Sequence, residues 1–215
     1  MRSSLPSPHR GSLAGAVIVG TSLFLSGCGV AADDPGHTGD ADVAADATTA
    51  GTPAAEAAPA DSGLPPDALP EIPGGRDSWE ECPYLDTAWV EETNGQRVLG
   101  VGTDPRFDTP ACVYWSYPDA PQLTVIVRDM PDEASAIAVV DWAAPIDSTE
   151  PAEEPEGWSG GRAGAGMVPG GLPTGHDGAL YAVQKDNRAV VVFTNQDQSL
   201  KAELVAKEVI GALGG

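Results

Sequence analysis

The chain has 215 residues, and its 11 Lys or Arg against 32 Asp or Glu give a formal net charge of −21 at pH 7. A surface this negative repels nucleic-acid phosphates, whose binding depends on Lys and Arg, and it disfavours adhesion to anionic lipid through a basic patch. Nucleic-acid binding is therefore excluded as a function.

The N-terminus predicts export. Basic residues precede an apolar run of thirteen residues, Leu13 to Leu25, which ends in the tetrapeptide Leu25-Ser26-Gly27-Cys28. This is the layout of a secretory signal peptide, and the run is shorter than the about 20 residues of a membrane-spanning helix. The tetrapeptide resembles the lipobox of bacterial lipoproteins. We expect cleavage of residues 1–27 and lipidation of Cys28, which would anchor the protein to the outer face of the cytoplasmic membrane in the cell envelope. The alternative is an ordinary signal peptide.

Residues 28–75 predict a tether. After Cys28 they are dominated by Ala, Asp, Gly, Pro and Thr, and they contain no Lys, Arg or aromatic residue. Such a composition buries too little apolar surface to fold, and its prolines and like charges favour extended conformations. All five Trp and all four Tyr follow Arg76, so we expect a single domain over residues 76–215.

Periodic segments define the elements of that domain. Runs rich in β-branched and aromatic residues predict strands at 97–101, 111–117, 123–128, 179–185 and 188–194. The turn sequences at 118–121 and Asp186-Asn187 predict two hairpins, and apolar spacing predicts helices at 131–142 and 197–213. The expected fold is α+β, with a mostly antiparallel sheet, two helices packed on one face and one disulfide.

The cysteines predict that disulfide. With Cys28 assigned to lipid, only Cys82 and Cys112 remain, and an even pair in an exported domain usually forms a bridge. Binding of a metal by this pair is the alternative, but it needs more Cys or His ligands, and His176 is the only histidine of the domain. We expect no metal and no cofactor.

Residues 143–178 show neither helical nor strand periodicity, and a segment of this length is usually functional or disordered. Trp158 stands among glycines, whose backbone can approach a ligand closely, and its ring suits a sugar or an apolar patch of a partner. Trp158, Arg162 and His176 are the candidate binding surface. In the alternative reading, Trp158 folds back onto the sheet and the segment is structural.

Catalytic motifs give little support to an enzyme. There is no Ser-x-x-Lys motif, and a Ser-His-Asp triad would have to combine His176 with Ser159 or Ser116. The acidic stretch 147–156 lacks the ligand spacing of an EF-hand, and the glycines at 160–166 lack the Gly-Lys-Ser/Thr ending of a phosphate loop. We assign no catalytic residue and favour a non-catalytic binding module. An envelope hydrolase that uses carboxylates and His176 is the alternative.

Several long stretches carry a resemblance to a known family: CPYLDTAWV (82–90), NGQRVLGVGTDPRFDTPACVYWSYP (94–118), QLTVIVRDMP (122–131), AVVDWAAPID (138–147), EEPEGWSGGR (153–162) and VVVFTNQDQSLKAELVAKEVI (190–210). They resemble a group of actinobacterial exported proteins known only as domain of unknown function twenty-twenty. The similarity covers roughly residues 80–213 and implies an α+β domain in the envelope. It implies no activity and no site residues, so the expected partners are the membrane, through the lipid, and an unidentified envelope protein or glycan.

Overall fold

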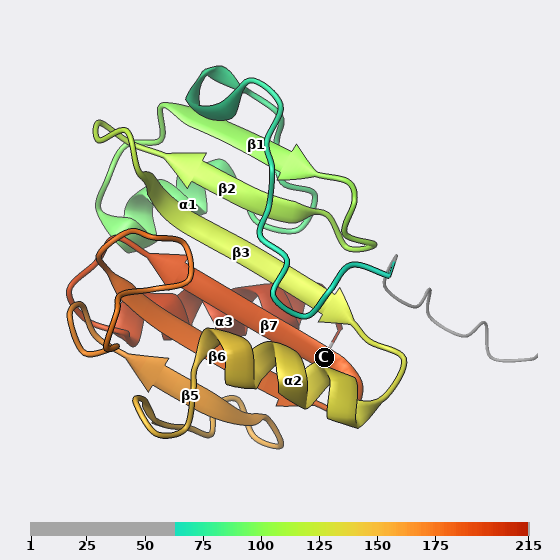
Figure 1. The fold of residues 1–215 in the computed structure, drawn as a ribbon. Coiled ribbons are helices and arrows are strands. Elements are labelled where there is room, and N and C mark those ends of the chain that lie inside the picture. The colour runs from blue at the N-terminus through green and yellow to red at the C-terminus, as the bar shows by residue number, and fades with distance from the viewer. Residues whose placement is uncertain (1–62, 215) are drawn as a thin grey trace, which may run out of the picture. The chain divides into compact units, whose positions relative to one another are not determined.

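A computed structural model describes residues 63–214, which form an α+β domain around one antiparallel sheet (Figure 1). The seven strands lie in the order β1-β2-β3-β7-β6-β5-β4. They are β1 (Gly100–Asp104), β2 (Ala111–Trp115), β3 (Pro121–Asp129), β4 (Glu150–Ala152), β5 (Ser159–Ala163), β6 (Ala179–Lys185) and β7 (Arg188–Thr194). The helices are α1 (Thr87–Asn94), α2 (Glu133–Ala143) and α3 (Leu200–Ala212), with a 3-10 turn, η1, at Gly75–Asp77. The predicted signal peptide, Cys28 and most of the predicted tether lie outside the described residues.

The predicted α+β class and antiparallel pairing are confirmed, but the helices do not share one face. Figure 1 shows α2 in front of the sheet and α1 and α3 behind it. Along β7, Val190 and Val192 pack in the core with α3, whereas Val191 and Phe193 pack in the core with α2. Because the central strands are apolar on both sides, each face of the sheet needs its own cover.

Both predicted hairpins are confirmed. In the β6–β7 hairpin, Lys185 pairs with Arg188, and Asp186 adopts a φ of 53° in the turn between them. Asp and Asn tolerate this left-handed conformation better than most residues. The β2–β3 hairpin contains a register shift between Tyr114 and Trp115.

Helix α1 was not predicted, although its ends carry ordinary signals. The Asp86 carboxylate accepts a hydrogen bond of 2.8 Å from the Trp89 amide, which caps the N-terminus. Gly95 ends the helix with a φ of 67°, the left-handed conformation typical of the residue after a helix. The helix is short, and it packs beside α3 on the back of the sheet.

The disulfide between Cys82 and Cys112 is confirmed, with the two Cα atoms 5.7 Å apart. It joins the segment before α1 to strand β2. Both cysteines are buried in the core that α3 covers, so the bridge holds the incoming chain against the back of the sheet.

The folded part begins before the boundary expected at Arg76. Residues 64–80, which we call the strap, cross the front of the sheet over β3, β2 and β1 (Figure 1). The strap ends as a short edge segment in which Trp79 pairs with Val101 in parallel orientation. The composition of residues 64–75 does not predict this path, which depends on contacts that the sheet makes with the strap.

Several charged side chains hold the strap, among them one on strand β3 and one on strand β1. Arg128, 1% exposed, donates hydrogen bonds of 2.8 and 3.0 Å to the carbonyl oxygens of Leu64 and Pro65. Asp104, also 1% exposed, accepts from the Glu71 amide at 2.8 Å and from the Arg106 guanidinium at 2.6 Å. Hydrogen bonds to charged groups contribute more stability than neutral ones, so these contacts fix the path of the strap.

Residues 143–178 are not a structureless loop, because they contain β4 and β5. These strands form one edge of the sheet, and β5 pairs along its whole length with β6. Gly160 is needed there, since a Cβ atom would overlap the Ala182 carbonyl oxygen. Close approach of the β6 backbone explains this glycine.

Candidate functional site

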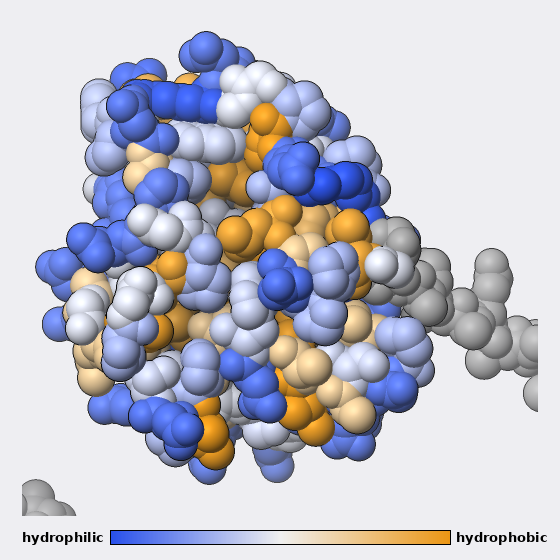
Figure 2. Space-filling view, in the orientation of Figure 1, coloured by the Kyte–Doolittle hydropathy of each residue, from blue (hydrophilic) through white to orange (hydrophobic). Residues whose placement is uncertain are grey.

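A groove on the front of the sheet is the strongest candidate site. Its cavity of about 180 Å³ is bounded by three elements: the strap, strands β2 and β3, and the loop before β6. The lining residues are Leu69, Pro70, Ile72, Gly75, Val113, Trp115, Pro121, Thr124, Thr174 and His176. We call this cavity the front groove. In Figure 2, hydrophobic residues gather in the middle of this face.

Strand alternation builds the floor of the front groove. Val113 and Trp115 project to the front of β2, while Cys112 and Tyr114 pack in the core behind the sheet. Val113 lies opposite Thr124 of β3 in the register. Trp115 is 7% exposed, so only a small part of its ring reaches the cavity.

The strap wall stands close to the sheet because β1 has glycines beneath it. A Cβ atom at Gly102 would overlap Ile72, and one at Gly100 would overlap the Arg76 carbonyl oxygen. Ile72 can therefore lie directly on β1 and present its side chain to the front groove. The two glycines are a structural requirement of this wall.

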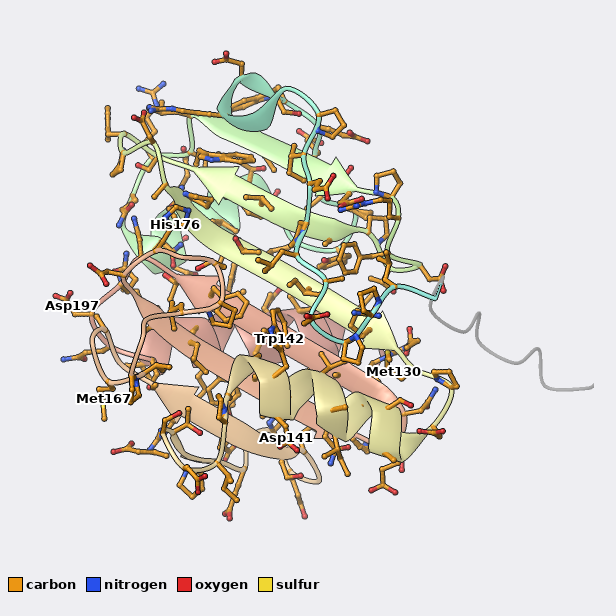
Figure 3. All side chains as sticks on the ribbon, in the orientation of Figure 1. Met130, Asp141, Trp142, Met167, His176 and Asp197 are labelled. Atoms are coloured by element: carbon orange, nitrogen blue, oxygen red, sulfur yellow. A yellow bond between two sulfur atoms is a disulfide. The ribbon has the colours of Figure 1, made fainter. Side chains whose placement is uncertain are left out.

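The opposite wall belongs to the loop between β5 and β6. Figure 3 shows His176 on this loop, at the end of the sheet where β3 begins. A smaller recess adjoins the groove and shares Pro121, Thr124, Thr174 and His176 with it. The recess also reaches Asp177 and Phe193.

Helix α2 supports the far side of this recess. The ring of Trp142, labelled in Figure 3, packs edge-on against the ring of Phe193, with centroids 6.2 Å apart. Edge-to-face packing of this kind favours one arrangement of the two rings. The recess is therefore backed by a packed part of the core.

Few ionisable groups border the front groove. Of the residues that line the groove and the recess, only His176 and Asp177 can ionise. Beside the lining residue Gly75, Arg76 of the strap forms an ion pair of 2.9 Å with Asp119 of the turn between β2 and β3. The site thus combines apolar walls with a few polar groups, which is the usual character of a ligand pocket.

Trp158 does not belong to this site, and its expected exposure is wrong. It is 4% exposed and lies in the core with Tyr181, Val183 and residues of α3. Its amide donates to the Pro155 carbonyl oxygen at 3.0 Å. The alternative weighed from the sequence, in which this ring folds back onto the sheet, is the arrangement that the structure has.

Arg162 lies on the same side as Trp158, behind the sheet. Its guanidinium is 3.7 Å from the Glu203 carboxylate of α3 and 3.6 Å from that of Glu150. Glu203 also pairs with Lys207 at 2.9 Å. Since His176 lies on the front, the structure does not bring the three predicted residues together. Arg162 attaches β5 to α3.

Ser159 stands in a Gly-x-Ser-x-Gly pattern, from Gly157 to Gly161, that the sequence reasoning missed. In hydrolases this pattern places the serine at a sharp turn between a strand and a helix. Here Ser159 opens β5, and its hydroxyl accepts a hydrogen bond of 3.3 Å from Gln184 of β6. The pattern lacks its structural context, so we interpret Ser159 as a residue of strand β5 that pairs with β6.

A wider depression of about 700 Å³ lies beside the disulfide. Asp86, Asp108 and Glu208 line it together with Tyr84, whose hydroxyl donates to the Pro110 carbonyl oxygen at 2.9 Å. Burial raises the pKa of Tyr84. The front groove is the better candidate for a small ligand, because three elements enclose it and most of its lining side chains are apolar.

Two features are absent from residues 63–214. Within that range, no three His, Cys, Asp or Glu side chains are grouped so that they could hold a metal ion. None of the helices there has the length and apolar character needed to cross a membrane.

Comparison with known proteins places the domain in a family. No curated protein matches the chain. A family model described as "Domain of unknown function (DUF2020)" matches residues 64–215. The match begins at the first residue of the strap, so the strap is part of the family domain. The chain belongs to the family of proteins that contain this domain of unknown function, DUF2020.

Proposed function

We propose that the protein is an exported lipoprotein, held by Cys28 at the outer face of the cytoplasmic membrane, and that its domain binds a small ligand in the front groove without catalysing a reaction. The front groove carries the binding part of this proposal. Its walls are apolar, and Thr124, Thr174 and His176 offer polar contacts at one end. Sites of this composition at the edge of a scaffold commonly bind small molecules.

The anchor part rests on the sequence. Cys28 follows Leu25-Ser26-Gly27 directly, and residues 29–62 separate it from the described domain. A single acyl chain gives only weak membrane binding, so a firm anchor needs more than one chain on this cysteine.

Expression of the full chain with Cys28→Ala tests the anchor. The variant should appear in the medium, whereas the unaltered protein should sediment with membranes. A variant that sediments as completely as the unaltered protein would disprove anchoring through Cys28. Cys82→Ala serves as a control, because it removes a cysteine from the domain and leaves the proposed lipid in place.

A fragment screen tests the binding. Neutral, cationic and anionic ring compounds are added to the full chain carrying Cys28→Ala, and the indole N–H signals of the tryptophans are followed by NMR. At least one compound should shift the signal of Trp115, assigned through Trp115→Phe, without shifting that of Trp79, which is 62% exposed and does not line the groove. If no compound of any charge shifts the Trp115 signal, the proposed binding function is wrong.

A further inference from the structure

We propose that the ligand of the front groove is a small cationic amine attached to a single apolar ring. This inference rests on the proposed binding function and adds the chemical class of the ligand. It combines the size of the cavity, the apolar side chains that line it and the charges around it.

The volume and the lining of the front groove limit the apolar part of the ligand. The cavity of about 180 Å³ is close to the engineered cavity of about 150 Å³ that binds benzene in another protein. Leu69 and Ile72 of the strap face Val113 and Trp115 of β2 across it. An apolar ring fills such a space and removes these side chains from water. The small exposed part of Trp115 offers no broad face for stacking a sugar, so a glycan fits less well.

The charged residues around the front groove limit the polar group of the ligand. Asp177 lines the recess that continues the groove and is exposed, and none of the ion pairs within residues 63–214 involves it. Arg76, the basic residue next to Gly75 in the groove lining, is paired with Asp119 at 2.9 Å. A ligand whose ring occupies the groove can therefore place a positive charge towards Asp177, whereas an anionic group there would meet repulsion.

The net charge of the whole domain also favours a cationic ligand. Of the 32 acidic residues, seven precede residue 63, which leaves twenty-five; of the 11 basic residues, Arg2 and Arg10 precede it, which leaves nine. An excess of one sign concentrates ligands of the opposite sign near a cleft and speeds their association. Cationic ligands are favoured at long range as well as in the groove.

The test compares three probes that share one ring and differ in charge: benzylamine, benzyl alcohol and benzoate. Each is titrated at pH 7 and low salt into the full chain carrying Cys28→Ala, and Kd is taken from the shift of the Trp115 indole signal. Benzylamine should bind about tenfold more tightly than benzoate, with benzyl alcohol between them. Asp177→Asn should weaken benzylamine by about two- to fivefold and leave benzyl alcohol unchanged.

Asp147→Asn is the matched control, since it removes the same charge from an exposed position outside the groove. If Asp147→Asn weakens benzylamine as much as Asp177→Asn does, recognition by Asp177 is wrong. If benzyl alcohol or benzoate binds as tightly as benzylamine, the inference fails while the proposed binding function stands. If no probe shifts Trp115, the inference fails, and the wider screen decides on the proposed function.

A capped peptide, Lys-Phe-Lys, separates a free amine from a protein partner. We expect it to bind more weakly than benzylamine, because its backbone cannot follow the ring between the strap and the loop before β6. Tighter binding of the peptide than of benzylamine would overturn the inference in favour of peptide docking.

Discussion

Replacing Trp158 with Ala should strongly destabilise the domain. The side chain is 4% exposed and packs in the core between β6 and α3. Truncation of a buried tryptophan to alanine costs about 3–5 kcal/mol, which is a large share of the about 5–15 kcal/mol that stabilises a typical domain. For a domain of this size, each 1 kcal/mol lowers Tm by about 2–4 °C. We therefore expect Tm to fall by about 6–20 °C.

Thermal unfolding followed by far-UV circular dichroism measures this loss, because that signal reports on the backbone and not on tryptophan. Trp79→Ala is the matched control: Trp79 is 62% exposed, and exposed substitutions usually change stability by less than about 0.5 kcal/mol. The two variants should differ clearly in Tm. A fall in Tm of less than about 2 °C for Trp158→Ala would refute the packing argument and would indicate that this side chain lies at the protein surface.

Three further predictions concern the strap, the disulfide and pH. Gly100→Ala should lower the free energy of unfolding by about 1–3 kcal/mol and speed amide hydrogen exchange in the strap, because the new Cβ overlaps the strap backbone. Gly211→Ala is the control: a Cβ there meets open space, so this variant should be stabilised by about 0.5–1 kcal/mol. Equal Tm values for these two variants would contradict the close approach. Reduction of the Cys82–Cys112 bridge should cost about 2–5 kcal/mol, seen as a lower Tm with reductant, and an unchanged Tm would show that the bridge adds no stability. Burial opposes ionisation of Asp104, but hydrogen bonds from Arg106 and the Glu71 amide outweigh it, so its pKa is lowered. The ionised Asp104 carboxylate therefore stabilises the fold at neutral pH, and this stabilisation is lost as the pH falls below about 4. Urea unfolding should therefore show a stability difference between the unaltered protein and Asp104→Asn that shrinks from pH 7 to pH 2.5; a difference that is constant with pH would be inconsistent with this shift.

Local sequence was sufficient to predict the central strands of the domain. The runs at 123–128 and 188–194 are rich in β-branched residues, which favour strands in any context that covers them. The Asp186-Asn187 turn joins β6 to β7 as expected, because its residues tolerate the required backbone conformation. Two cysteines in a domain predicted to be exported were enough to predict their pairing. These features depend on residues that are neighbours in sequence or on a choice between very few partners.

The edge of the sheet could not be predicted in the same way. β5 has the sequence Ser-Gly-Gly-Arg-Ala, which lacks the bulky alternation of an isolated strand. It becomes a strand because β6 offers a paired edge and because Gly160 admits the backbone of Ala182. Trp158 directly precedes β5, so this pairing places its side chain in the core that α3 covers. The residues that make this segment a strand belong to β6, about twenty positions further along the chain.

By itself, the sequence determined the class of the fold, its central strands, two of its helices, its disulfide and one residue of the candidate site, His176. Only the tertiary structure decided that the strap forms a wall of the front groove. Arg128 holds the strap through the carbonyl oxygens of Leu64 and Pro65. Every residue has a backbone carbonyl, so such contacts leave no pattern in the strap sequence. Glycines in β1 then decide how closely the strap can lie, and that distance shapes the groove.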